Sequence, residues 1–257
     1  MLTLIILSHH DQGTPRPPLT ELPRQCVHSQ DPQIVLVCTS APVLQGHPTG
    51  LWLEEAATPY YLFRASGLEV VLASPAGGPV PIDQNSMGGD FLTADCQKFL
   101  HDAEAVGALS HTVKLSDVDW STVDGIYLTG GHGVCVDYIN NATLKSAIET
   151  LYNADKVVAA DCHGPIALAD CCKPDGTPLV AGKCVTGFAD SEEYAVQLAS
   201  IVPFLIETKF VEQGAKYEKA ASDWHPKVCV DGKLVTGQNP ASSKDCAQAV
   251  VDLLLKA

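Results

Sequence analysis

The sequence predicts an α/β fold in which helices cover both faces of a mostly parallel central sheet. Short runs of apolar and β-branched residues alternate with longer segments whose apolar residues recur at helical spacing. This alternation is typical of a doubly wound sheet built from βαβ units. The chain has 257 residues, of which 46% are apolar, so it can bury one large core. Since the sequence shows neither an internal repeat nor a long linker, we expect a single domain over residues 33–257.

The first half of this domain contains two expected strands and two helical segments. Residues 33–39 (QIVLVCT) are rich in β-branched residues and form the first strand. A helix is expected over residues 51–66, and Gly67 is a suitable residue to end it. The second strand follows at 68–73, and a polar, helical insertion is expected over 91–108.

The middle of the chain repeats the pattern of strand and helix. A short apolar strand at 125–129 precedes a helix over 141–153, whose apolar positions share one face. Residues 157–160 form the next strand, and a helix is expected from the following turn to Cys171. A further short strand is expected at 184–186.

The C-terminal part is expected to contain helices and one hairpin. Residues 192–210 are helical in two pieces interrupted by a proline. An Asp-Gly pair between two short apolar runs within 227–236 predicts a β-hairpin. The closing helix covers 243–256, with Ser242 or Ser243 as its N-cap.

The charge of the chain restricts its partners. The sequence contains 30 acidic and 16 basic residues, which give a formal charge of −14. Because polyanions repel such a chain, we expect neither nucleic acid nor a membrane as the main partner. The composition instead favours a small-molecule substrate.

The 10 cysteines predict a reducing compartment rather than a disulfide framework. No pair has C-x-x-C spacing, and no cysteine–histidine array resembles a zinc module, so we expect no metal site. Several cysteines lie in apolar runs, where a thiol acts as a small hydrophobic group. These features favour a cytoplasmic protein, with the nucleus as a further compartment.

Residues 1–32 differ from the rest of the chain. Residues 1–7 are apolar without a basic segment before them, and several prolines follow. A signal peptide and a disordered extension are the two alternatives, and we expect a disordered extension.

Residues 157–165 (VVAADCHGP) are the most informative stretch for chemistry. A buried strand leads into a tight turn, and Gly164 and Pro165 fit the start of a helix. Cys162 therefore lies at the carboxyl edge of the sheet, where open α/β folds bind their ligands. The helix N-terminus would favour the thiolate, so we predict a nucleophile. The alternative is a buried structural cysteine.

Two neighbouring features could assist this thiol. His163 could act as general base or supply a backbone N–H to an oxyanion, or it could simply cap the turn on the surface. The glycine-rich loop at 130–133 (GGHG) follows another strand and would open at the same edge of the sheet. Its backbone N–H groups could approach a substrate, but no Gly-Lys-Ser/Thr follows, so it is not a phosphate loop.

Acidic residues supply candidates for a third group. Glu54 and Glu55 begin the first helix, and the periodicity leaves open which of them points inward. Asp190, Glu192 and Glu193 lie together after a Thr-Gly-Phe turn. They could orient His163 or merely favour a helix N-terminus.

Several motifs in a fixed order carry a family resemblance over residues 33–256. They are residues 49–55, 72–75 and 81–83, then 130–133 with Asp137, 162–165, 185–188 with Glu192 and Glu193, and 235–243. With these motifs the chain resembles the DJ-1/PfpI superfamily, and within it the Hsp31-like branch.

The resemblance implies a flavodoxin-like three-layer sandwich and a homodimer. It also implies a glutathione-independent glyoxalase of the D-lactate dehydratase type, a lyase that converts methylglyoxal to lactate in defence against dicarbonyl stress. The implied substrate is a small 2-oxoaldehyde. Members of the family are also described as protein deglycases, holding chaperones and stress proteins.

The resemblance further implies roles for individual residues. Cys162 would be the nucleophile, His163 its imidazole partner and Glu193 the acid of a triad. Glu55 would be a buried acid that touches the thiol. The backbone N–H groups of Gly131 and His163 would form the oxyanion site. Neither a metal nor a cofactor is implied.

The sequence departs from the family pattern at two positions. Asp161 stands where family members usually have a small or apolar residue, and Thr58 stands where they often have histidine. A carboxylate that faced Cys162 would raise the pKa of the thiol. Strand alternation directs Asp161 to the other face, so we expect tuning of the thiol rather than loss of activity.

Two other functions remain open from the sequence. A redox-sensing chaperone or protein deglycase with little small-molecule turnover could use an oxidisable Cys162 beside Glu55. A cysteine amidase or peptidase could use the same cysteine, histidine and acid, although no peptide-binding insertion is evident.

Overall fold

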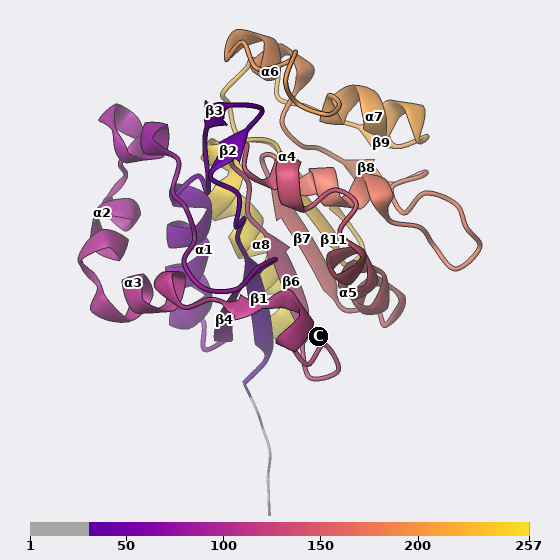
Figure 1. Cartoon of the computed structure of the whole chain (residues 1–257). Helices are drawn as coiled ribbons and strands as arrows, with labels where there is room; N and C mark the ends of the chain where they lie inside the picture. Colours follow the sequence, from indigo (N-terminus) through magenta and orange to yellow (C-terminus); the bar gives the residue numbers. More distant parts are fainter. Residues whose placement is uncertain (1–30, 257) are drawn as a thin grey trace, which may run out of the picture. The chain divides into compact units, whose positions relative to one another are not determined.

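The computed structural model describes residues 31–256. Residues 1–30, which make up nearly all of the expected N-terminal extension, lie outside the described part of the chain. A sheet of 7 strands, in the order β10-β11-β7-β6-β1-β4-β5, forms the centre (Figure 1). Its strands are β1 (Gln33–Val37), β4 (Glu69–Ser74), β5 (Val113–Lys114), β6 (Gly125–Leu128), β7 (Val157–Asp161), β10 (Val228–Asp231) and β11 (Leu234–Gly237).

The pairing of these strands confirms a mostly parallel sheet. β1 pairs in parallel with β4 on one side and with β6 on the other. β6, β7 and β11 continue the parallel arrangement, and β5 extends it at the far edge. β10 and β11 are antiparallel and are joined by Gly232 and Lys233, which confirms the predicted hairpin.

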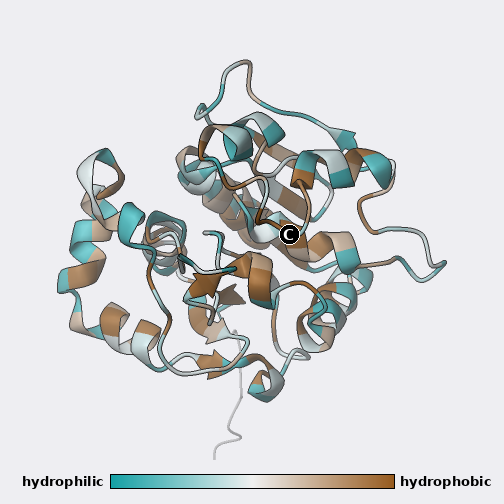
Figure 2. Ribbon diagram, turned by 45° about the horizontal axis from the view of Figure 1, so that its top comes forward, coloured by the Kyte–Doolittle hydropathy of each residue, from teal (hydrophilic) through white to brown (hydrophobic). Residues whose placement is uncertain are grey.

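Helices cover both faces of the sheet, as the flavodoxin-like three-layer fold requires. Along β1, Ile34 and Leu36 pack toward one face, and Val35 and Val37 pack toward the other. α1 (Glu54–Ala65) and α8 (Ser243–Leu255) cover the first face, with α2 (Ala94–His101) and α3 (Ala103–Ser110) outside them, and α5 (Ala142–Asn153) covers the second. Figure 2 shows the central strands in brown and polar residues on the outer helices.

Shorter elements lie around this centre. Two small sheets pair β2 (Val43–Leu44) with β3 (His47–Pro48), and β8 (Cys184–Val185) with β9 (Lys216–Tyr217). The remaining α-helices are α4 (Val134–Asp137), α6 (Asp190–Ala195) and α7 (Ile206–Glu212). The 3₁₀ helices are η1 (Gln84–Met87), η2 (Gly89–Phe91), η3 (Leu115–Asp117), η4 (Gly164–Asp170) and η5 (Pro240–Ser242).

Two local predictions from the sequence are wrong. The segment after Cys162 is the 3₁₀ helix η4 rather than an α-helix. No serine hydroxyl caps α8, because Ser242 has helical backbone angles that continue from η5. The Ser242 hydroxyl instead accepts hydrogen bonds from the backbone of Lys227 and Gln238.

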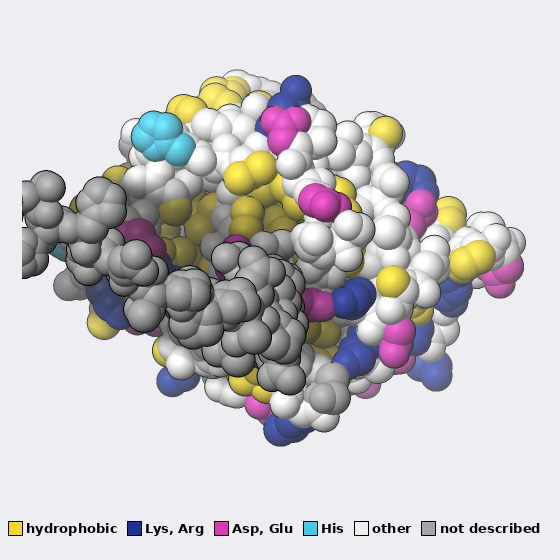
Figure 3. All heavy atoms as spheres, turned by 90° about the horizontal axis from the view of Figure 1, so that it is seen from below, with side chains coloured by type: hydrophobic (Ala, Val, Ile, Leu, Met, Phe, Trp, Pro, Cys, Tyr) yellow, Lys and Arg dark blue, Asp and Glu magenta, His cyan; other side chains and the backbone are white. Residues whose placement is uncertain are grey.

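Charged side chains of both signs occur on the described surface. On the described part of the face in Figure 3, lysine and arginine side chains are interspersed with aspartate and glutamate. Among residues 31–256, no helix is both long enough and apolar enough to cross a membrane.

The close packing of η4 against β6 gives a test of the fold. A Cβ atom at Gly164 would collide with the carbonyl oxygen of Leu128. We expect Gly164→Ala to lower the free energy of unfolding by about 3 kcal/mol. The matched control is Gly107→Ala in α3, where no atom lies within 4 Å of the added carbon. That control should raise stability by up to ~1 kcal/mol. Equal midpoints for the two variants in urea denaturation would contradict this account.

Candidate active site

Cys162 follows the last residue of β7 in a conformation that is uncommon for a side chain with Cβ. Its φ is +58°, in the left-handed region. Backbone hydrogen bonds fix this turn, since the Cys162 N–H donates to Gly237 O at 3.1 Å and the Phe188 N–H donates to Cys162 O at 2.8 Å. The residue is 3% exposed. Such strained, well-fixed backbone is typical of functional turns.

The structure brings together three of the predicted residues. Cys162 Sγ lies 3.3 Å from His163 Nδ1, although the two residues are adjacent in sequence. His163 Nε2 lies 2.8 Å from Glu193 Oε2. The thiol, the imidazole and the carboxylate therefore form a continuous chain of contacts, with the geometry of a nucleophile, a base and an orienting acid.

A second imidazole, on His132, completes this cluster. His132 Nε2 lies 2.8 Å from the other carboxylate oxygen of Glu193, and its ring centroid is 4.0 Å from that of His163. The GGHG loop was expected to contribute only backbone groups, so the role of this side chain was not predicted from the sequence. The available signal was a histidine that directly follows a strand at the same edge of the sheet as Cys162.

The two imidazoles determine the protonation of the carboxylate. Burial alone would raise the pKa of Glu193, but the adjacent His163 and His132 rings hold it well below its usual value. The pKa of His132 is lowered by burial and by the neighbouring His163. Glu193 is therefore ionised across the physiological range and accepts a hydrogen bond from each ring.

Glu55 is the inward-facing acid at the start of α1. It is fully buried, and its Oε2 accepts a hydrogen bond from the Gly130 N–H at 2.6 Å. Among the described residues, its Oε1 has no conventional hydrogen-bond partner, and the carboxyl contacts the Cys162 thiol. Burial and the nearby Asp161 raise its pKa well above the usual value. Glu54, by contrast, lines the pocket described below.

Asp161 points away from the thiol, toward α8. It accepts a hydrogen bond from Ser243 Oγ at 2.7 Å, and burial raises its pKa to about 7. Strand alternation therefore separates its side chain from the pocket as expected. It still acts on the site, because its charge raises the pKa values of both Glu55 and Cys162.

The predicted preference of Cys162 for the thiolate is wrong for the resting site. Burial raises the pKa of the Cys162 thiol well above its usual value, and the carboxylates of Glu55 and Asp161 add to this effect. The segment that follows is a short 3₁₀ helix, whose dipole does not outweigh the effects of burial and of the two carboxylates. The backbone N–H of Gly131 acts in the opposite sense, because it favours negative charge on the sulfur.

Close approaches at two glycines, Gly130 and Gly131, assemble the site. Gly131 has a φ of +86°, and a Cβ there would collide with Gly50 O. A Cβ at Gly130 would lie 2.6 Å from Glu55 Oε2 and 2.7 Å from the backbone nitrogen of His163. The glycines thus allow the loop after β6 to pack directly against α1 and the Cys162 turn.

A pocket of about 770 Å³ opens above the sulfur. Cys162, His163 and His132 form its polar base. Its apolar walls include Trp52, Phe91, Phe188, Val196, Leu198 and Trp224. Thr58 is buried and donates to Asp95 Oδ2 at 3.0 Å, and it is absent from the described pocket lining.

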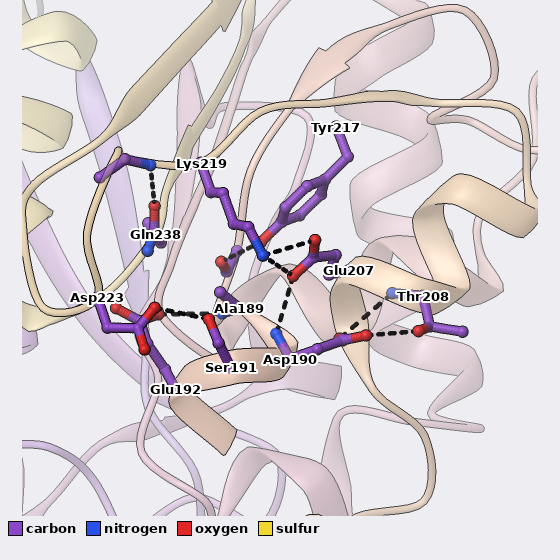
Figure 4. A network of polar contacts seen from close by, with 12 residues as sticks. Ala189, Asp190, Ser191, Glu192, Glu207, Thr208, Tyr217, Lys219, Asp223 and Gln238 are labelled. Carbon is purple, nitrogen blue, oxygen red and sulfur yellow. Dashed lines mark hydrogen bonds and ion pairs between the residues drawn. The ribbon is translucent and has the colours of Figure 1, made fainter. Parts of the chain in front are cut away.

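Polar contacts hold α6, which carries Glu193, against the neighbouring segments. The Asp190 N–H donates to Glu207 Oε2 at 3.0 Å, and Lys219 also pairs with Glu207 (Figure 4). On the other side of the helix, Ser191 Oγ donates to Asp223 Oδ1 at 2.6 Å. The first turn of α6 is therefore fixed at both sides.

The histidine–carboxylate cluster also has the donor types of a metal site. Ligand atoms of His132, His163 and Glu193 all lie within 4.8 Å of one another. A cation here would occupy the same Nε2 atoms that contact Glu193 and would disconnect the carboxylate from His163. The arrangement is thus suited to proton transfer in its present form.

Comparison with known proteins identifies relatives that match most of the chain. Glyoxalase 3 of Candida albicans is 33% identical over 213 residues, covering 80% of this chain and 90% of that protein. The glutathione-independent glyoxalase HSP31 of Saccharomyces cerevisiae is 33% identical over 218 residues, covering 81% of this chain and 91% of that protein.

Solved structures also show similarity over most of the chain. The crystal structure of glyoxalase III from Candida albicans superposes with a TM-score of 0.80 at 31% identity, covering 86% of this chain and 97% of that chain. The Rapid Encystment Protein 24 kDa of Francisella tularensis superposes with a TM-score of 0.82 at 36% identity, covering 87% and 99%.

A model of the DJ-1/PfpI family matches residues 49–253, a span that contains the cysteine turn, the glycine-rich loop and α6. This chain belongs to the DJ-1/PfpI family.

Proposed function

We propose that this protein is a glutathione-independent glyoxalase that converts a 2-oxoaldehyde such as methylglyoxal to D-lactate, without a metal or cofactor. One observation carries the proposal: the Cys162 thiol lies between a buried carboxyl, Glu55, and an imidazole, His163, at the base of a largely apolar pocket. The similarity to glyoxalases over most of the chain supports this chemistry.

The first step is addition of the Cys162 sulfur to the aldehyde carbon. The thiol proton passes to His163 Nδ1, which lies 3.3 Å away, and then to the aldehyde oxygen. The product is a hemithioacetal. The backbone N–H of Gly131, which favours negative charge at the sulfur, would stabilise charge on this oxygen as it forms.

The second step moves a hydrogen between the two substrate carbons. The Glu55 carboxylate removes the proton from the former aldehyde carbon, which gives an enediol. Protonation of the neighbouring carbon then yields a lactoyl thioester on Cys162. Water hydrolyses this thioester, which releases lactate and restores the thiol. The net reaction adds one water and needs no external oxidant or reductant.

The buried acids change the pKa values of the groups in this site. Burial and the nearby Asp161 raise the pKa of Glu55 well above its usual value, so the group can act in turn as acid and as base. While Glu55 is neutral, it places no negative charge beside the sulfur. The Cys162 thiol then loses its proton more readily. The burial and raised pKa of Cys162 give no support to a low-pKa redox sensor. The homodimer and the cytoplasmic location stay predictions.

Removal of the nucleophile tests the proposal directly. We expect Cys162→Ser to lower lactate formation from methylglyoxal by at least about a thousandfold, because a serine hydroxyl is a far weaker nucleophile than a cysteine thiol. The assay uses protein treated with chelator, in glutathione-free buffer, and chiral chromatography of the product. Cys172→Ser is the control and should retain full activity. Wild-type protein with reduced Cys162 that forms no lactate would refute the proposal.

The dependence of kcat on pH tests the role of Glu55. A base acts while ionised, so activity should fall as pH decreases through the raised pKa of Glu55 rather than through the ordinary value. Glu55→Gln should lower kcat by about 10²–10⁴-fold and remove this acidic limb. Asp161→Asn removes a charge that raises the pKa of Glu55, so the limb should move to lower pH.

The control for the Glu55 and Asp161 variants is Asp245→Asn, which changes an exposed aspartate on the same helix as Ser243. It should leave the pH profile unchanged. An unchanged acidic limb in both Glu55→Gln and Asp161→Asn would assign the proton transfer to another group.

The stability of the protein should report the histidine–carboxylate cluster. The folded pKa of Glu193 lies below its unfolded value of 4.5. Ionised Glu193 therefore makes its full contribution to the free energy of unfolding above its unfolded pKa. This contribution is lost as pH falls through the folded pKa. Glu193→Gln should lower the free energy of unfolding by about 3 kcal/mol at pH 7, and the difference from wild type should shrink below pH 4.5. Urea denaturation at several pH values measures this, with the exposed Glu212→Gln as control. A difference that does not change with pH would contradict the assignment.

A further inference from the structure

A second cluster of potential ligands lies apart from the pocket. Cys184 is in β8, Glu218 directly follows β9, and Cys229 is in β10. One ligand atom from each lies within 4.8 Å of the other two. Both cysteines are free thiols, and none of the three residues lines the pocket above Cys162.

The backbone holds these elements together independently of the thiols. The Cys184 N–H donates to Asp231 Oδ2 at 2.9 Å, which ties β8 to the end of β10. Two residues later, the Thr186 N–H donates to Thr236 Oγ1 at 2.9 Å. Thr236 is the partner of Cys229 in the hairpin, so the two cysteines are fixed on neighbouring segments.

The third residue is fixed in the same way, through β9. The Glu218 N–H donates to Val185 O at 2.9 Å. Its carboxylate pairs with Lys227, which uses one of the two carboxylate oxygens. The other oxygen can still bind a cation. The cluster is thus preorganised on three strand segments, of which β8 is distant in sequence from β9 and β10.

The exposure of the cluster suits an ion that enters from solvent. Cys229 is 3% exposed and forms the floor, Cys184 is half-buried, and Glu218 is exposed at the rim. Two sulfurs and one carboxylate oxygen are a ligand set that borderline-soft divalent cations prefer over Mg²⁺ or Ca²⁺.

We propose that Cys184, Cys229 and Glu218 bind one zinc-class divalent cation, with water as the fourth ligand. Tetrahedral coordination with Zn–S bonds of about 2.3 Å places the two sulfurs about 3.8 Å apart. The ligand atoms already lie within 4.8 Å of one another, so closure needs a shift of about 1 Å or less. Binding releases one proton from each thiol, and the carboxylate is already ionised.

A bound cation would also affect the stability of this part of the fold, because its ligands come from three different strand segments. The cation would crosslink β8 and β9 to the hairpin and stabilise this side of the molecule.

Metal titration of the full chain tests the site. Reduced, chelator-treated protein is titrated first with Co²⁺ and then with Zn²⁺. We expect one equivalent of Co²⁺ to give the sulfur-to-cobalt charge-transfer absorption of two thiolates, with release of about two protons. Zn²⁺ should abolish this absorption. At a hundredfold excess over Kd, Zn²⁺ should raise Tm by about 5–10 °C.

Variants locate the cation. Cys184→Ser and Cys229→Ser should each weaken Zn²⁺ binding about a hundredfold or more in competition with a chromophoric chelator. Glu218→Gln, which changes an exposed side chain, should weaken it less and keeps the test valid if Cys229→Ser fails to fold. Cys172→Ser is the matched control and should bind normally. His163→Ala removes a donor of the other cluster and should also bind normally.

Three results would overturn the proposal. The first is a Co²⁺ titration without charge-transfer absorption. The second is binding that is lost in His163→Ala but retained in Cys184→Ser, which would place the cation at the histidine cluster. The third is a Cys184–Cys229 disulfide in protein purified without oxidant, seen as a mass 2 Da lower. The proposal is independent of the glyoxalase reaction, so activity of the metal-free protein does not affect it.

Discussion

The left-handed backbone at Cys162 is the constraint on which the rest of the site depends. A residue with φ of +58° can persist only where the surrounding backbone fixes it. Here Gly237 and Phe188 bond the turn from two sides, and Gly130 allows the neighbouring loop to reach within contact of His163. This geometry bends the chain sharply enough for adjacent residues to place a thiol and an imidazole 3.3 Å apart.

Burial of two carboxyl groups near that turn is the main electrostatic consequence. Glu55 and Asp161 share a region of low polarity, and each makes ionisation of the other and of Cys162 less favourable. The cluster behaves as one coupled system in which a proton on Glu55 favours a charge on the sulfur. On the opposite side of the thiol, Glu193 stays ionised because two imidazoles face it. Acid and base functions are thus separated by environment rather than by residue type.

The sequence predicts much of this arrangement, and particular residues show where prediction stops. The strand before Cys162 and the Asp-Gly hairpin have local signals that the structure confirms. The sequence has no local signal that distinguishes Glu54 from Glu55. Both follow an apolar run, and only packing against Gly130 determines which one is buried. The contact of His132 with Glu193 joins residues 61 positions apart, and no local pattern reports it. Likewise, strand alternation gives the direction of Asp161 but not its electrostatic effect through the buried cluster.

Hydrogen bonds and ring contacts link the pocket wall to α6, the helix that carries Glu193. Glu192 precedes Glu193 on α6, and its Oε1 accepts hydrogen bonds from the Trp224 N–H at 2.8 Å and from Asn239 Nδ2 at 2.7 Å. The Trp224 ring contacts that of Phe188 in a tilted arrangement, with centroids 5.9 Å apart, and the Phe188 backbone N–H holds the Cys162 turn. A displacement of this wall by a bulky substrate would therefore be transmitted to α6 and to the His163–Glu193 contact.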